Sequence, residues 1–242
     1  GYRADMNIEA KAAASDPLNN AQRERLLIAQ ATLGRTLALA GELDEGIALL
    51  RRAVDAAKQL HATEPGSTLF HEDVGLYSAQ LARLLRLRGD EVGAARLAAQ
   101  SQSAFEKLVA SDAAQPAWQR EYAETLTELA KQASTSGHDE MAMELLRKAL
   151  AVLESQVAGN AQDRATVLAA VAARLHLATL SQPTERSMLA GAALAAIEAQ
   201  TAAPADPRLQ ALRVESLLLL HRVQEARTLG ETLMASGYRD AG

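Results

Sequence analysis

The sequence predicts an all-α protein built as a solenoid of paired helices, because similar residues return at a fixed step of 48. One set of positions holds leucine, at Leu33, Leu81, Leu129 and Leu177, and a second holds small residues, at Gly46, Ala94, Ala142 and Ala190. A constant period of small and aliphatic positions is typical of a repeat array. The composition agrees, since 48% hydrophobic and only 3% aromatic residues suit a long, thin core of Leu and Ala.

Each unit is predicted to contain two helices joined by a tight turn. Between residues 25 and 40 the apolar residues recur at steps of three and four, on one face of a helix. Gly41 ends this helix, because glycine adopts the left-handed conformation past a helix end without a steric penalty. Glu42, Asp44 and Glu45 then begin the second helix, where carboxylates interact favourably with the helix dipole. We expect these acids to be helix-start residues and not general acids. The same signal returns at Gly89 with Asp90 and Glu91, and at Gly137 with Asp139 and Glu140.

These positions resemble the tetratricopeptide repeat (TPR). The first unit carries the resemblance at Leu33, Gly34, Leu37, Gly41, Gly46, Leu50 and Ala53. The second matches at Leu81, Ala82, Leu85, Gly89, Ala94, Ala98 and Ser101, and the third at Leu129, Ala130, Gly137, Ala142, Leu146 and Ala149. The resemblance implies a right-handed solenoid of about five antiparallel helix pairs and a non-catalytic module that binds proteins. The family's repeat has about 34 residues, so a 48-residue period predicts that each helix is longer by about two turns, or roughly 11 Å.

We expect one TPR-like domain over residues 1–242. Its units are predicted at about 20–62, 67–110, 116–158, 162–200 and 206–236. Residues 6–20 align with residues 102–116, which form the end of a second helix and its linker. Residues 1–19 are therefore expected to be the end of a preceding, truncated unit, and the chain a fragment of a longer protein. The alternative is an ordinary N-terminal capping helix, because terminal repeats are often atypical.

A narrower resemblance concerns the linking segments 14–25 and 110–122 and the tail 209–240. They are similar to the C-terminal repeat segments of bacterial eukaryotic-like serine/threonine kinases and related regulators. This resemblance implies an alternative function as the sensor or regulatory segment of such a kinase. The segment would then be a cytoplasmic or extracytoplasmic part of a membrane-anchored parent. A second alternative is an oligomerisation scaffold.

Composition and motifs argue against several other classes of function. A net charge of −5 and a pI of about 5.6 disfavour nucleic-acid binding, which needs a basic surface. No apolar run approaches the roughly 20 residues that span a bilayer. There is no cysteine, no phosphate loop, and no nucleophile or zinc motif, so we expect no catalytic residue and no cofactor. The polar triplet His71, Glu72 and Asp73 is not expected to bind a metal, because successive helical residues point in different directions.

The candidate site is a set of basic residues. Arg35, Arg83 and Lys131 occupy the same position in the first helix of three consecutive units, and Arg86 lies one turn beyond Arg83. The TPR resemblance implies that first helices line the concave groove that contacts a ligand. Stacked helices lie about 8–10 Å apart, so the cations would form a ladder for an acidic peptide or protein partner. The alternative is that they are solvated and complement the helix dipole.

Overall fold

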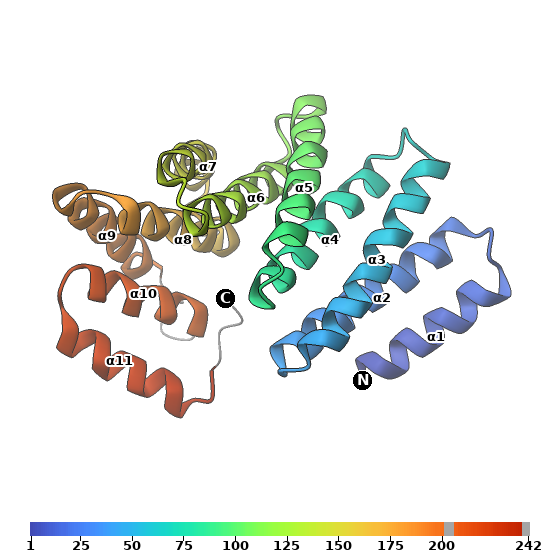
Figure 1. Cartoon of the computed structure of the whole chain (residues 1–242), viewed down its shortest axis with the longest axis horizontal. Helices are drawn as coiled ribbons and strands as arrows, with labels where there is room; N and C mark the ends of the chain where they lie inside the picture. The colour runs from blue at the N-terminus through green and yellow to red at the C-terminus, as the bar shows by residue number, and fades with distance from the viewer. Residues whose placement is uncertain (201–205, 239–242) are drawn as a thin grey trace. The chain divides into compact units, whose positions relative to one another are not determined.

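The computed structural model describes residues 1–200 and 206–238, and within them it contains eleven helices. Of the predicted segments, the end of the tail and part of the last linker lie outside these residues. Contacts along the chain group it into two compact units, Gly1–Trp118 and Gln119–Asp240. Figure 1 shows the helices in chain order.

The first unit contains five helices and the beginning of a sixth. The bounds are α1 (Tyr2–Ser15), α2 (Asn20–Leu39), α3 (Leu43–Thr63), α4 (Thr68–Leu87), α5 (Glu91–Ser111) and the start of α6 (Pro116–Thr135). α2 packs against α3, and α4 against α5, so consecutive helices form pairs. α3 also packs on α4, and α2 contacts α4, which joins the two pairs.

The second unit contains the rest of α6 and five further helices. Their bounds are α7 (Asp139–Gly159), α8 (Arg164–Leu180), α9 (Pro183–Glu198), α10 (Pro207–Leu219) and α11 (Val223–Ala235). α8 packs against both α7 and α9, and α10 packs against α8, α9 and α11. One buried apolar cluster, which includes Val171, Leu175, Ile197 and Leu209, joins α8, α9 and α10.

The predicted fold class, all-α with helices packed in sequential pairs, is confirmed. α2, α4, α6 and α8 begin at residues 20, 68, 116 and 164, which keeps the 48-residue period. α2 begins at Asn20, where Asn19 Oδ1 accepts a hydrogen bond from the Gln22 amide and caps the helix. The expectation of a single domain over the whole chain, with its unit limits, stays a prediction.

The turn glycines end their helices as predicted. Gly41, Gly89 and Gly137 have φ of 93°, 86° and 78°, in the left-handed region. After each glycine the next amide donates back into the last turn: Glu42 to Leu37 O at 2.8 Å, Asp90 to Leu85 O at 2.9 Å, and His138 to Ala133 O at 2.8 Å. This hydrogen bond satisfies a carbonyl that the helix end leaves without a helical partner.

The acids after the turns lie at helix starts, also as predicted. Glu42 is the N-cap of α3, and Asp44 and Glu45 lie in its first turn. Asp90 Oδ1 accepts a hydrogen bond from the Gly93 amide at 2.9 Å. These carboxylates therefore stabilise helix ends.

The small positions of the repeat lie where helices approach most closely. A Cβ atom built on Gly46 would lie 2.6 Å from the carbonyl oxygen of Gly34, in the partner helix of the pair. The equivalent residues Ala94, Ala142 and Ala190 are all buried. Short side chains at this level let the two helices of a pair cross at short range.

Candidate functional site

The predicted basic residues lie on the first helices of their pairs. Arg35 is on α2, Arg83 and Arg86 are on α4, and Lys131 is on α6. Arg35, Arg83 and Lys131 each follow the first residue of their helix by 15 positions, so they occupy the same helical level. Arg35 is exposed, whereas the other three are half-buried. Arg35 has no hydrogen bond or ion pair to any residue that the structure describes.

Lys131 belongs to the second unit, and its charge is partly compensated within its own helix. Its Nζ atom donates to Glu128 Oε1 at 3.0 Å, an ion pair one turn apart. Glu128 is buried, so this ion pair is less screened by solvent than an exposed pair is. Lys131 therefore offers a ligand less unbalanced charge than Arg35 does.

In the first unit, α2 and α4 form a surface with several charged and polar side chains, which we call the first-helix surface. Its members are Glu24 and Arg35 from α2, Glu72 from α4, and the buried Asp73 and Tyr77 of α4; Tyr77 interacts electrostatically with the other four. Arg35 lies close enough to Tyr77 to favour its ionised form, whereas burial and Asp73 raise the pKa of this phenol. Charges of both signs therefore meet on this surface.

Asp73 is a buried carboxyl with a strongly shifted pKa. Only 6% of the residue is exposed. Its Oδ2 atom makes no hydrogen bond to any described residue. Burial raises the pKa of Asp73 to about 7, and the negative charges of Glu24 and Glu72 add to this effect. Near neutral pH this carboxyl changes its charge, in contrast to an exposed aspartate.

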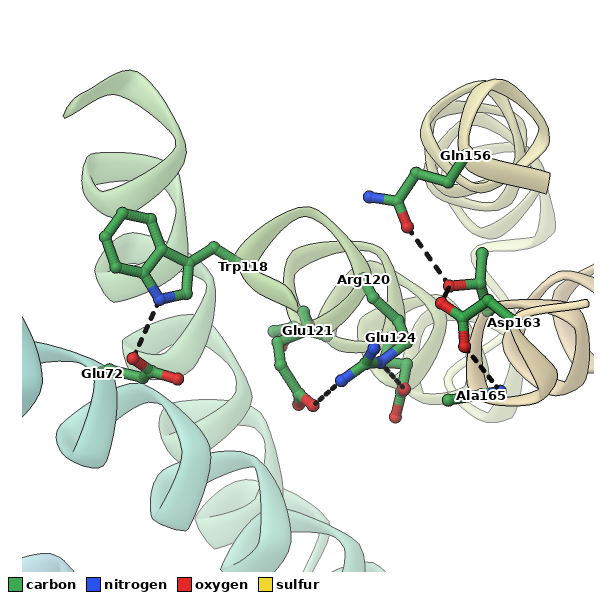
Figure 2. A network of polar contacts seen from close by, with 10 residues as sticks. Glu72, Trp118, Arg120, Glu121, Glu124, Gln156, Asp163 and Ala165 are labelled. Carbon is green, nitrogen blue, oxygen red and sulfur yellow. Dashed lines mark hydrogen bonds and ion pairs between the residues drawn. The ribbon is translucent and has the colours of Figure 1, made fainter. Parts of the chain in front are cut away.

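The sequence did not single out Asp73 as a site residue. It lies in the triplet His71, Glu72 and Asp73, whose members meet three different environments. His71 stacks on His61. Glu72 accepts a hydrogen bond from Trp118 Nε1 at 2.9 Å, which ties the start of α6 to α4 in the first unit (Figure 2). Asp73 faces the interior. Its burial depends on how neighbouring helices pack on α4, so no local signal in the sequence could have identified it.

The second unit contains a separate polar network, also drawn in Figure 2. Arg120 lies 3.5 Å from Glu121 Oε1 and 3.7 Å from Glu124 Oε1. Asp163 caps α8, since it accepts hydrogen bonds from the Ala165 amide at 3.1 Å and the Thr166 hydroxyl at 2.6 Å. The Thr166 hydroxyl, and then these backbone amides, hold the pKa of Asp163 below its ordinary value against the effect of burial. The Asp163 part of this network stabilises a helix start.

Neither a metal site nor a membrane span is found in the part of the chain that the structure describes. Among these residues, no three His, Cys, Asp or Glu side chains are placed to hold one metal ion. None of the described helices is both long enough and apolar enough to cross a bilayer.

Comparison with known proteins identifies the fold. No protein-family model matches this sequence, and no curated protein matches it in sequence. The structure is similar to that of BtubC (BKLC) from P. vanneervenii, with a TM-score of 0.64 and 16% identity over 99% of this chain and 91% of that one.

Two further similar structures are TPR-like repeats of a putative kinesin light chain from Podosopora anserina, one of them a variant with a single substitution. Their TM-scores are both 0.56. The variant is 20% identical over 88% of this chain and 94% of its own, and the other is 21% identical over 90% and 99%. The chain therefore has a TPR-like repeat fold. These comparisons give no support to the resemblance with kinase-associated repeats.

Proposed function

We propose that this chain is a non-catalytic module that binds a peptide segment of a partner protein on its first helices. The observation that carries the proposal is Arg35, an exposed cation with no ion pair among the described residues, at the helical level that Arg83 and Lys131 also occupy. A long basic side chain without a counter-charge at a repeated position favours an acidic partner. The TPR-like fold supports this role, since repeat arrays present extended surfaces for binding.

The first-helix surface also contains groups that can form hydrogen bonds with a peptide. Arg35 can form a bidentate pair with a carboxylate. The half-buried Glu72 offers a carboxylate oxygen to a backbone amide of an extended chain, whereas Tyr77 is buried and offers no group to a ligand. The partner expected from this arrangement is an acidic segment that also donates backbone hydrogen bonds.

Binding of a fluorescein-labelled acidic peptide, followed by anisotropy at low salt, tests the proposal. The triple variant Arg35→Glu, Arg83→Glu, Lys131→Glu is expected to bind about tenfold or more weakly, because each reversal replaces attraction with repulsion. The single variant Arg35→Glu changes an exposed residue only and should weaken binding by a smaller factor.

A matched control changes three exposed arginines on the second helices of the pairs, Arg51→Glu, Arg96→Glu and Arg147→Glu. This control has the same net charge as the triple variant and should retain most of the binding. Circular dichroism of both variants checks that the helical content is unchanged. Equal loss in both variants, or no binding by the unmodified chain, would show that the basic positions are not a specific site.

The two alternative functions remain predictions. A kinase-regulatory role predicts that removal of these repeats changes the activity of a parent kinase. A role as an oligomerisation scaffold predicts self-association at tens of micromolar in sedimentation experiments.

A further inference from the structure

A second candidate site lies in the first unit and shares no residue with the first-helix surface. A pocket of about 390 Å³ opens where α3, α4 and α5 meet. Its polar lining is Lys58 and His61 from α3, His71 from α4, and Gln100, Ser103 and Lys107 from α5. Every ionisable side chain in this lining is basic. A pocket lined by hydrogen-bond donors and by no carboxylate is suited to an anion.

The two lysines have no counter-charge. Lys58 and Lys107 are both exposed, and neither forms an ion pair or hydrogen bond with any residue that the structure describes. They approach the pocket from two different helices, α3 and α5. Like charges held at one pocket repel each other, and a bound anion would replace this repulsion with two attractive interactions.

The histidines add a second basic pair. The rings of His61 and His71 are stacked, with centroids 4.7 Å apart and planes inclined by 30°. Burial lowers the pKa of His71, and the positive charges of His61 and Lys107 lower it further. His61 Nδ1 is buried and has no hydrogen bond within the described residues.

We propose that this pocket binds a phosphate group. A phosphate has two negative charges and several acceptor oxygens, which match two ammonium groups, two imidazole rings and the Ser103 hydroxyl. A carboxylate has one charge and two oxygens and would leave part of this donor set unused. The Gln100 amide is already engaged, since its Nε2 donates to Ser78 Oγ at 2.9 Å. The phosphate comes either as the free ion or as a monoester.

Titration of the full chain with sodium phosphate at constant ionic strength tests the proposal, with NMR detection of the histidine side chains at pH 7. We expect saturable shifts of His61 and His71 with a Kd on the order of 1 mM or tighter. A parallel titration uses O-phosphoserine. Tighter binding of phosphoserine indicates a monoester ligand, and equal or weaker binding indicates the free ion. Absence of saturation with both probes at tens of millimolar would overturn the proposal.

The lysines are tested with a matched pair of variants. Lys58→Gln with Lys107→Gln removes both ammonium groups and should weaken phosphate binding at least about fivefold. Arg52→Gln with Arg96→Gln removes two exposed charges from the same two helices and should leave the affinity within about twofold. Similar weakening in both double variants would mean that phosphate only screens the net charge, which contradicts a site.

The titration of His71 provides an independent readout. The groups around it are Lys58 and His61 on α3 and Lys107 on α5. Because a bound dianion favours imidazolium, phosphate should raise the pKa of His71 by about half a unit or more. An unchanged pKa in saturating phosphate would place the ion elsewhere and refute the proposed pocket.

Discussion

At the scale of single residues, Asp73 makes the stability of the first unit depend on pH. An aspartate in the unfolded chain has its ordinary pKa near 3.8, whereas burial raises the value in the folded chain to about 7. Between these values the folded chain holds a proton that the unfolded chain has released. The contribution of Asp73 to the free energy of unfolding is therefore highest near pH 4 and falls as the pH rises toward 7.

Replacement of this carboxyl should remove that dependence. We expect Asp73→Asn to be more stable than the unmodified chain by about 1 kcal/mol at pH 8, because no charge is then buried. Near pH 4 the two proteins should be about equally stable. Urea unfolding at both pH values measures the difference. Asp55→Asn, at an exposed position on α3, is the control and should have little effect at either pH. Destabilisation by Asp73→Asn at pH 8 would mean that the carboxylate has a partner there.

At the scale of helices, the crossing of α2 and α3 depends on the absence of side chains. The Cβ of an alanine at position 46 would lie 2.6 Å from the Gly34 carbonyl oxygen and 3.2 Å from the Ala38 Cβ. Both are fixed parts of a neighbouring helix, so the helices would have to separate. We expect Gly46→Ala to destabilise the first unit by about 1–3 kcal/mol, despite the better helix propensity of alanine.

Gly191→Ala is the matched control. Gly191 also lies within a second helix, α9, but a Cβ there would have no heavy atom within 4 Å. The substitution then has only the effect of the higher helix propensity of alanine, so this variant should be more stable by up to about 1 kcal/mol. Gly46→Ala should lower the urea midpoint of the first unit, and Gly191→Ala should raise that of the second unit. Shifts of the same sign would show that the α2–α3 contact does not determine how Gly46→Ala changes the free energy of unfolding.

At the scale of the whole molecule, the grouping of contacts into two units predicts that unfolding can be uncoupled. The one tryptophan of the sequence, Trp118, is the last residue of the first unit and donates to Glu72 of α4. Its fluorescence therefore reports on the first unit, whereas far-ultraviolet circular dichroism reports on all helices.

In Gly46→Ala, the fluorescence transition should move to lower urea while a part of the helical signal keeps the original midpoint. This outcome is expected because repeat arrays lose cooperativity when one region is destabilised more than its neighbours. Superimposed transitions by both probes in this variant would instead indicate that the two units unfold as one.

The repeat pattern of the sequence determined the fold class, because periodicity and turn chemistry are local. Gly41, Gly89 and Gly137 identify their turns without any knowledge of the fold, since only glycine adopts the left-handed conformation freely. The small residues at Gly46 and Ala94 similarly indicate where helices cross. The step of 48 residues predicted where the first helix of each pair begins.

The functional surfaces depend on tertiary structure. The burial of Asp73 results from the packing of other helices on α4, and the convergence of Lys58 with Lys107 results from α3 and α5 both packing on α4. These residues are 49 positions apart in the chain, and neither belongs to a motif. The pKa of a carboxyl and the charge of a pocket depend on neighbours in space, so the sequence alone could predict the helices but not what their surfaces bring together.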